Sequence, residues 1–240
     1  MALLKRLVFD IEGNNLVRYI TKLWCICICD LNSPNHIEQY TPSSISEGLS
    51  RLSEADIIIG HNICGFDIPA IKKLYPDWSY KSARDTYCMS KLFNPERTKG
   101  HSLESYGEEF GIVKPEHEDW TQYSPEMLHR CTEDVKINTR LYQELVMKHC
   151  TNWNWLDALL LEQEDTLIQI EQEENGVDFN KDRAYKLIKV IDTKINNLSE
   201  ELLFRLPKRV VPIGTVNNPF KKDRTYIKKV QEWISSYTIK

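Results

Sequence analysis

Two carboxylates near the start of the chain are spaced to share one ligand. Asp10 and Glu12 stand two residues apart in FDIEG, within an apolar stretch that reads as a strand. Alternate side chains of a strand point to one face, so the two carboxylates would lie side by side. They would repel each other and lose hydration unless a divalent cation offset both costs. Oxygen ligands suit Mg²⁺ or Mn²⁺, although such a pair is also common on a solvated surface.

Two further aspartates stand where other elements are expected. Asp67 ends the stretch HNICGFD and opens a helical pattern, a position where an acid is also favourable for purely structural reasons. Asp134 lies in PEMLHRCTEDVKINTRLYQEL, whose apolar spacing predicts a helix from Pro125 to Leu145. Each of these acids, taken alone, is compatible with a surface position, so their meaning depends on whether the fold brings them together.

The elements that must position these acids predict an α/β domain. Three successive strands would form an antiparallel meander, and the pattern then switches to alternating strand and helix. The expected strands are 4–13, 23–31, 36–42 and 56–62, and the expected helices are 44–55, 67–77, 84–93, 101–112 and 125–145. We therefore predict a mixed sheet covered by helices for residues 1–150.

Residues 151–240 are predicted to form a helical appendage. One helix would end at Gly176, and a long amphipathic helix would follow Asn180, a suitable N-cap, and stop at Pro207. After an irregular stretch, a last short helix is expected at 225–235. These helices would either dock on a partner or pack against the first domain.

Composition limits the class of protein. A hydrophobic fraction of 41% and a charged fraction of 28% fit a globular chain, and no apolar run reaches the roughly 18 residues of a membrane span. The start of the chain does not read as a signal peptide, so we expect a cytoplasmic protein. Seven cysteines include no C-x-x-C pair, and Cys25, Cys27 and Cys29 have the period of a strand, which favours free thiols over a metal site.

Charge is distributed unevenly along the chain. The net charge is −4, which argues against binding nucleic acid by bulk attraction, yet residues 205–240 hold nine basic side chains and two acidic ones. Such a basic tail would contact phosphates, or it would be a solvated segment with no partner.

The acids and their neighbours together resemble a known family. The order D-x-E, N-x(4)-D and H-x(4)-D resembles the DEDD (DnaQ-like) superfamily of 3′–5′ exonucleases, and the resemblance covers roughly residues 4–148. The motif residues are Asp10, Glu12, Asn62, Asp67, His129 and Asp134. The resemblance implies a ribonuclease-H-like fold with a mixed five-stranded sheet and flanking helices. Most similar is the proofreading domain of phage-type family A DNA polymerases, on the segments HNICGFDIPAIKKL, RDTYCMSKLF, HSLESYGEEFG and IEQEENGVDFNKDRAYKL.

The resemblance also implies a mechanism. Two Mg²⁺ or Mn²⁺ ions would be held by the four carboxylates, Asp10, Glu12, Asp67 and Asp134, and His129 would be the general base. Polymerase-linked relatives usually carry a tyrosine where this chain has Arg130, which is permanently charged and cannot accept a proton. On a helix, five residues advance the side chain by about 500°, so His129 would serve best at a helix start or on a mobile loop. The alternative is a surface histidine on a continuous helix.

Four residues are implied to contact the substrate: Asn62, Leu16, Phe66 and Gly13. Leu16 and Phe66 stand where relatives stack or wedge terminal bases, a contact that tolerates any sequence. Both would equally serve as core residues, and Asn62 would equally brace the turn before Asp67.

The function implied is a metal-dependent 3′–5′ exonuclease that releases 5′-mononucleotides from single-stranded or frayed DNA 3′ ends. Because this chain lacks the length of polymerase palm and fingers, we expect it to proofread as a subunit or fragment of a family A DNA polymerase. The alternatives are a standalone exonuclease that trims DNA or RNA 3′ ends, and a non-catalytic polymerase assembly module.

Overall fold

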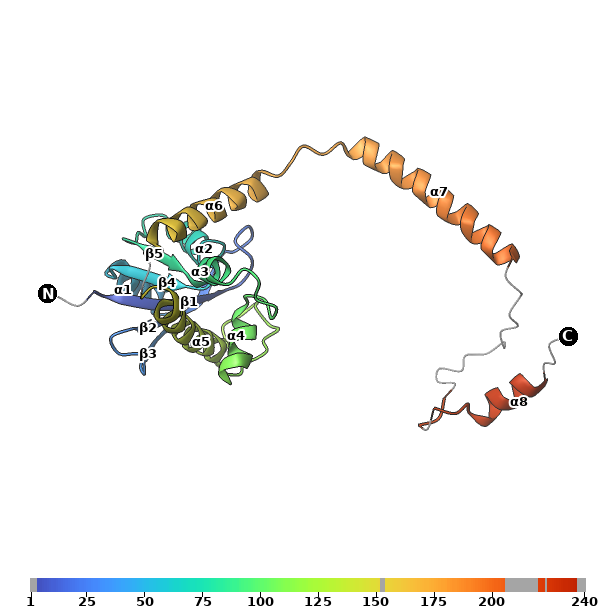
Figure 1. Cartoon of the computed structure of the whole chain (residues 1–240), viewed down its shortest axis with the longest axis horizontal. Coiled ribbons are helices and arrows are strands. Elements are labelled where there is room, and N and C mark those ends of the chain that lie inside the picture. The colour runs from blue at the N-terminus through green and yellow to red at the C-terminus, as the bar shows by residue number, and fades with distance from the viewer. Residues whose placement is uncertain (1–3, 152–153, 206–219, 223, 237–240) are drawn as a thin grey trace. The chain divides into compact units, whose positions relative to one another are not determined.

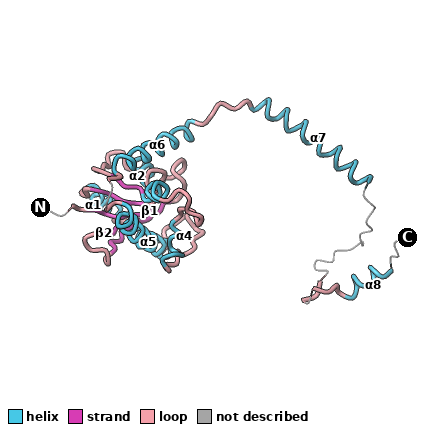
Figure 2. Tube along the Cα trace, in the orientation of Figure 1, coloured by secondary structure: helices cyan, strands magenta, loops and turns pink. Residues whose placement is uncertain are grey.

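The computed structural model describes residues 4–151, 154–205, 220–222 and 224–236 (Figure 1). Five strands and eight helices are assigned in these residues (Figure 2). Their order is β1 (Arg6–Gly13), β2 (Leu23–Asp30), β3 (Ile37–Tyr40), α1 (Ile45–Ser53), β4 (Ile57–Gly60), α2 (Asp67–Leu74), β5 (Ala83–Asp85), α3 (Thr86–Phe93), α4 (Leu103–Phe110), α5 (Pro125–His149), α6 (Leu156–Asn175), α7 (Lys181–Arg205) and α8 (Lys228–Ser236).

The strands form one mixed sheet in the order β3-β2-β1-β4-β5. Strands β1, β2 and β3 pair antiparallel, which confirms the predicted meander, and β4 and β5 continue the sheet parallel to β1. The segment from Arg84 was expected to begin a helix, but Ala83–Asp85 forms the short strand β5. Its last residue, Asp85, caps α3 and accepts hydrogen bonds from the backbone N–H groups of Tyr87 and Cys88. A strand of three residues is too short to show a period-2 pattern, so this one was not predicted as a strand.

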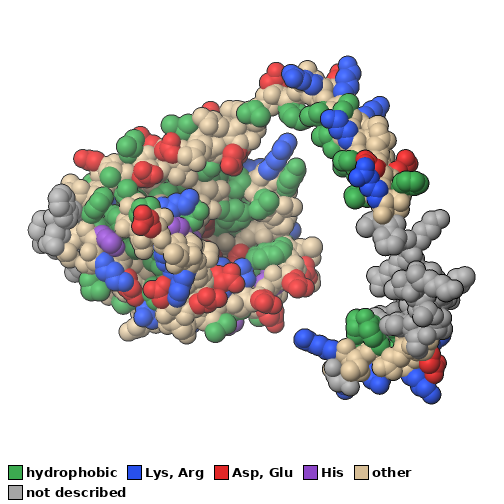
Figure 3. All heavy atoms as spheres, turned by 45° about the vertical axis from the view of Figure 1, so that its right-hand side comes forward, with side chains coloured by type: hydrophobic (Ala, Val, Ile, Leu, Met, Phe, Trp, Pro, Cys, Tyr) green, Lys and Arg blue, Asp and Glu red, His purple; other side chains and the backbone are tan. Residues whose placement is uncertain are grey.

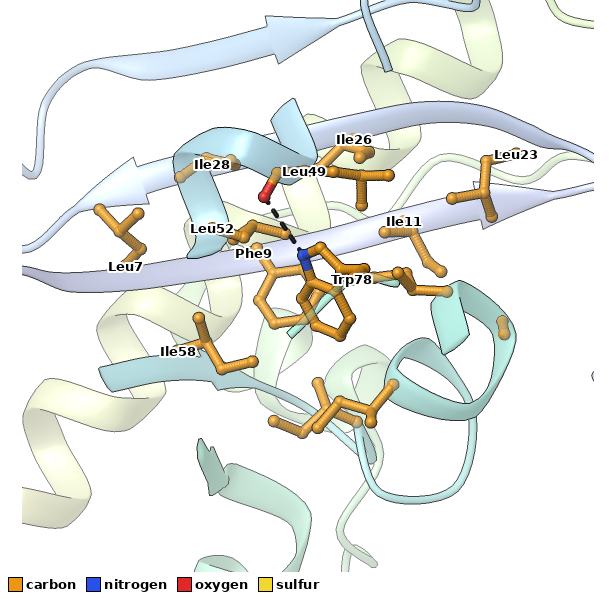
Figure 4. Packing of buried hydrophobic residues seen from close by; sticks show 14 of the residues in the cluster. Leu7, Phe9, Ile11, Leu23, Ile26, Ile28, Leu49, Leu52, Ile58 and Trp78 are labelled. Carbon is orange, nitrogen blue, oxygen red and sulfur yellow. Dashed lines mark hydrogen bonds between the residues drawn. The ribbon is translucent and has the colours of Figure 1, made fainter. Parts of the chain in front are cut away.

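One face of the sheet is mainly apolar. Leu7, Phe9 and Ile11 alternate along β1 and point to this face, where helices α1 and α2 cover them. Figure 4 shows their packing around Trp78, whose indole Nε1 donates to the backbone oxygen of Leu49 at 3.2 Å. This hydrogen bond satisfies the one polar group of a buried tryptophan.

The opposite face is covered mainly by α5 and carries the acids. Val8 points to this face and is fully buried, so Asp10 and Glu12, which follow it at alternate positions, must emerge on the same side. The three cysteines of β2 also lie here, and they are free and buried, as the strand reading of that segment predicted. The site therefore forms on the side of the sheet where α5 lies.

The chain divides into two compact units, residues 1–177 and 178–240. Helix α6, predicted to belong to the appendage after residue 150, lies in the first unit. Its Leu159 is buried, and its Gln163 accepts a hydrogen bond from the backbone N–H of Asp85 at 3.0 Å. In this structure the predicted boundary at 150 therefore moves to the segment after α6.

The second unit contains α7 and α8. Helix α7 begins after Asn180, whose side chain accepts from the Arg183 N–H at 2.9 Å, so the predicted N-cap forms. No residue of α7 is buried, and hydrophobic side chains gather along one side of it (Figure 3). Most of the stretch predicted to be irregular, 207–223, lies outside the described residues, as does part of the basic tail. Among the helices that are described, none is both long and apolar enough to cross a membrane.

Candidate active site

Three carboxylates meet at one point between the sheet and α5. Oxygen atoms of Asp10, Glu12 and Asp134 all lie within 4.8 Å of one another. Asp67, the first residue of α2, lines the same cavity, which has a volume of about 470 Å³. The structure thus brings together all four acids that the sequence singled out.

Packing of α5 on β1 sets this arrangement. Cys131 is fully buried, and its thiol donates to the backbone oxygen of Asp10 at 3.4 Å. Val135 is also fully buried on the same side of the helix. Asp134 stands between these anchors on α5, so its carboxylate is directed to the end of β1 where Asp10 and Glu12 lie.

A tight turn delivers Asp67 from the end of β4. Asn62 has a φ of 61°, and its backbone oxygen accepts hydrogen bonds from Gly65 and Phe66, both at 3.0 Å. Its own N–H donates to Asp85 at 2.9 Å. Asn62 therefore braces the turn before Asp67, as one reading of the sequence proposed. It also lines the cavity and remains exposed, so a contact with substrate is still open to its side chain.

The acids of the cavity resist ionisation. Burial, reinforced by the nearby charge of Asp134, raises the pKa of Asp10 to about 7. Burial also raises the pKa of Glu12 and of Asp67 well above their usual values, and Asp10 adds to both shifts. The pKa of Asp134 is raised by burial as well, although Lys114 opposes the shift. Four acids with raised pKa values in one cavity make a strongly cation-seeking site.

The protein supplies only part of the compensating charge. Lys114 Nζ lies 2.7 Å from Asp134 Oδ2, and Arg130 Nε lies 3.7 Å from Glu12 Oε1. The other oxygen of Asp134, Oδ1, is buried without a hydrogen-bond partner, and so is Oδ1 of Asp67. Buried carboxylate oxygens without partners are costly. This donor set, made entirely of carboxylate oxygens, fits a divalent cation such as Mg²⁺ or Mn²⁺.

His129 does not join this cluster. Helix α5 is continuous from Pro125, so His129 lies in its second turn rather than at a helix start or on a loop. Its side chain is 62% exposed, its Nδ1 lies 3.7 Å from Glu133, and it is not among the residues that line the cavity. The structure thus corresponds to the alternative of a surface histidine on a continuous helix, and the general-base role of His129 has no geometric support.

A different histidine does line the cavity. His61 lies in the cavity wall, and its Nδ1 is hydrogen-bonded to Thr86 Oγ1 at 2.9 Å. Thr86 in turn donates to Asn138 at 2.7 Å, which makes Thr86 the acceptor from a protonated Nδ1. Burial lowers the pKa of His61 to about 3, so the imidazole is neutral, and its Nε2 is buried without a partner.

Lys114, Arg130 and Tyr87 are cavity residues that the motifs did not identify as functional. Lys114 stands in an irregular segment with no periodicity to place it. Arg130 was noted only as a departure from tyrosine. Arg130 was predicted to lie on the same helix as Asp134, one turn earlier. This spacing was the signal in the sequence that the two side chains are close together.

A groove of about 350 Å³ adjoins the cavity and shares Glu12 and Phe66 with it. Leu16 lies on this groove and is 71% exposed, which excludes its reading as a core residue. Trp120 and Gly13 complete the apolar part of the wall. Gly13 has a packing role too, since a Cβ there would lie 2.5 Å from Ile20. An exposed leucine beside two aromatic rings makes an apolar surface with the chemistry that base stacking requires.

The chain is similar in sequence to two phage DNA polymerases. No protein-family model matches the chain. It is similar to the DNA-directed DNA polymerases of Escherichia phage T7 (24% identity over 83% of this chain and 36% of the polymerase) and of Enterobacteria phage T3 (25% identity over 72% and 33%). The chain therefore spans about a third of the length of these curated relatives.

Two solved structures share the fold. Brucella melitensis NrnC matches with a TM-score of 0.53 and 16% identity over 74% of this chain and 91% of that one. Escherichia coli RNase D matches with a TM-score of 0.52 and 15% identity over 68% and 45%. The predicted five-stranded mixed sheet with flanking helices is thus confirmed, and the chain has a ribonuclease-H-like fold.

Proposed function

We propose that this chain is a metal-dependent 3′–5′ exonuclease that releases 5′-mononucleotides from single-stranded or frayed DNA 3′ ends. Its expected context is proofreading for a phage-type family A DNA polymerase. The observation that carries the proposal is the meeting of Asp10, Glu12 and Asp134 within 4.8 Å, with Asp67 in the same cavity. Nothing in the packing of a sheet against helices requires four converging acids, because buried like charges cost free energy.

The four carboxylates would hold two Mg²⁺ or Mn²⁺ ions. Asp10, Glu12 and Asp134 are close enough to share one ion, and Asp67 would serve the second together with Asp10. Such ions activate water and stabilise the leaving oxygen when a phosphodiester is hydrolysed. The Mg²⁺-bound structure of NrnC, a fold neighbour, is consistent with this choice of cation.

The protein's own side chains would bind and orient the strand. Leu16 and Phe66 would stack against the last bases in the groove. Glu12 lines both the groove and the cavity, so the terminal linkage would pass this residue on its way to the acids. Stacking without base-specific hydrogen bonds suits an enzyme that must accept any mispaired 3′ end. Correct positioning of the linkage is a major part of the rate enhancement expected here.

Similarity beyond the first unit supports the polymerase context. The match to the phage T7 polymerase covers 83% of this chain, more than the first unit provides, because that unit ends at residue 177 of 240. It therefore extends into α7. That helix exposes apolar side chains at helical spacing, including Ile188, Ile191 and Ile195. An apolar helix face of this kind is suited to burial against another part of a polymerase.

The activity is tested with single-stranded DNA labelled at its 5′ end and incubated with Mg²⁺ or Mn²⁺. We expect a ladder that shortens from the 3′ end, 5′-mononucleotides as the product, no cleavage in EDTA, and no cleavage by the Asp10→Ala variant. A matched RNA oligomer separates DNA proofreading from RNA trimming. Absence of cleavage of both polymers by the native chain would favour the non-catalytic assembly module.

The polymerase context is tested separately by gel filtration with the polymerase region of a phage T7-type enzyme at micromolar concentration. We expect co-elution, and we expect it to be lost when Ile191 and Ile195 are both replaced by aspartate. Replacement of Lys189 and Lys194 on the same helix by glutamine is the matched control. Separate elution of the native chain would contradict the association while leaving the exonuclease proposal intact.

A further inference from the structure

Arg130 is held firmly at the edge of the cavity. Its Nη1 donates to the backbone oxygen of Pro115 at 2.6 Å, and its guanidinium lies 5.6 Å from the centre of the Trp120 ring. The side chain is 21% exposed, so part of it still faces open space. A guanidinium fixed on one side by a carbonyl and an aromatic ring loses little further freedom when it binds a ligand.

The donors of Arg130 are not used up by the acids. The distance of 3.7 Å from Arg130 Nε to Glu12 Oε1 is that of an ion pair and is too long for a hydrogen bond, whereas Lys114 Nζ forms a closer ion pair with Asp134 Oδ2, at 2.7 Å. A guanidinium carries five N–H donors in a planar fork, and the geometry of that fork matches the oxygens of a phosphate. Arg130 therefore has donors left to offer, in a planar arrangement that fits a phosphate.

The location of Arg130 matches the path of a strand. Trp120, on which it rests, lines the groove, while Arg130 itself lines the cavity, and Glu12 lines both. A strand that stacks its last bases in the groove and delivers its terminal linkage to the acids must pass this border. The linkage carries a negative charge towards a site made of four acids, so a cation at this point would favour its approach.

We propose that Arg130 binds the phosphate of the 3′-terminal linkage through its guanidinium. The inference rests on the proposed exonuclease function and deepens it. The tyrosine expected here from the family resemblance would offer a single neutral hydroxyl, whereas Arg130 supplies charge and several donors. Arg130 is thus a substrate-binding residue that acts on charge and does not accept a proton.

The test is a double-mutant cycle with one change in the protein and one in the DNA. Binding of a fluorescent single-stranded oligomer is measured by anisotropy in EDTA, where the ions are removed and no turnover occurs. The oligomer carries either a phosphodiester or an uncharged methylphosphonate at its last linkage. For each protein the ratio of the two dissociation constants is compared, so that repulsion from the acids, present in every variant, cancels.

We expect the preference for the phosphodiester over the methylphosphonate oligomer to be about tenfold greater in the native chain than in Arg130→Gln. This is the size expected when a hydrogen-bonded charge pair is lost. Arg130→Met, which keeps an unbranched stem over Trp120, should match Arg130→Gln and serves if the latter does not fold. The control is Arg140→Gln. Arg140 also lies on α5, donates to the backbone oxygen of Phe110 at 3.1 Å and sits 4.4 Å from that ring, but it does not line the cavity.

Equal ratios in the native chain, Arg130→Gln and Arg130→Met would overturn the inference. The exonuclease proposal would survive that result if the native chain still degrades DNA with Mg²⁺. If the native chain neither binds the oligomers nor degrades DNA, the proposed function and the role of Arg130 both fall. A ratio in Arg140→Gln that differs from the native one would show an effect of helix charge and would also overturn the inference.

Discussion

Two groups of acids lie at opposite ends of the same sheet and are treated differently by the fold. At the end where β1 begins, Asp30 and Glu38 share Arg51, which donates to Glu38 at 3.0 and 3.1 Å and to Asp30 at 3.3 Å. At the other end, Asp10 and Glu12 face Asp134, with a longer ion pair from Arg130 and a single lysine contact. Both groups are largely shielded from water.

The pKa shifts of the two groups have opposite signs. Burial opposes the ionisation of Glu38, but hydrogen bonds from Arg51 and Tyr40 outweigh it and hold the pKa of Glu38 below its usual value. Burial raises the pKa of Asp10 to about 7, and the neighbouring Asp134 adds to the shift. Acids that serve the fold are supplied with donors, whereas acids left short of donors mark the place where a cation belongs.

The largest expected effect comes from neutralising one aspartate at each end. Asp10→Asn should lower the rate of 3′–5′ cleavage by about 10³-fold or more, because a ligand to the ions is lost. Asp30→Asn should leave the rate within about twofold, since Asp30 ends β2 opposite Leu7, near the start of β1 and away from the site, and its amide oxygen would still accept hydrogen bonds. Single-turnover cleavage of a labelled oligomer measures both. Comparable losses in the two variants would contradict the distinction.

The change of folding stability with pH should have opposite signs for the acids at the two ends of the sheet. The folded state holds a proton on Asp10 up to about pH 7, whereas the unfolded chain releases it near 3.8, so this group lowers stability as pH rises between those values. Glu38, whose pKa is lowered, instead contributes stability above its unfolded value of 4.5 that is lost as pH falls.

Urea unfolding in EDTA at pH 5 and pH 8 measures this difference. Asp10→Asn should be more stable than the native chain at pH 8, by about 1–2 kcal/mol, and the difference should be smaller at pH 5. Glu38→Gln should be less stable than the native chain at both pH values. A lower stability of Asp10→Asn at pH 8 would mean that the acid cluster is satisfied without a cation.

Removal of Arg51 should affect stability alone. Arg51→Gln leaves Asp30 and Glu38 without their shared partner in a partly buried setting, which should cost about 1–2 kcal/mol. Cleavage rate at saturating Mg²⁺ should stay within about twofold of the native rate. A large loss of rate in a variant that remains folded at the assay temperature would connect this end of the sheet to the site.

The smallest effect is expected from His129→Ala. The imidazole lies on the exposed side of α5 beside Glu133, so its removal should change the cleavage rate by less than about twofold. A pH–rate profile of the variant should keep the shape of the native one. A loss of about 10²-fold with metal binding intact would restore His129 as the general base.

The sequence predicted the part of the site that depends on local periodicity. Asp10 and Glu12 share a face because a strand alternates, and Asp134 meets them because a helix with buried Cys131 and Val135 must pack on that face. The same helical geometry predicts that the side chain of His129 points about 140° away from that of Asp134 around the helix axis. Because α5 is continuous, the two side chains keep this separation.

The parts that were not predicted depend on tertiary contacts. Lys114 reaches Asp134 from an irregular segment whose path no local pattern determines. The three-residue β5 forms because β4 offers a parallel partner, and α6 joins the first unit through long-range contacts such as that of Gln163 with Asp85. Secondary-structure propensity does not predict such pairings, because long-range contacts override local preferences.

The central claim is that the four acids form a divalent-cation site, and diffraction from crystals grown with Mn²⁺ tests it most directly. We expect an anomalous peak about 2.0–2.4 Å from oxygens of Asp10, Glu12 and Asp134. A second peak should lie beside Asp67. The absence of any anomalous peak at millimolar Mn²⁺, with Lys114 and Arg130 still paired to Asp134 and Glu12, would contradict the account.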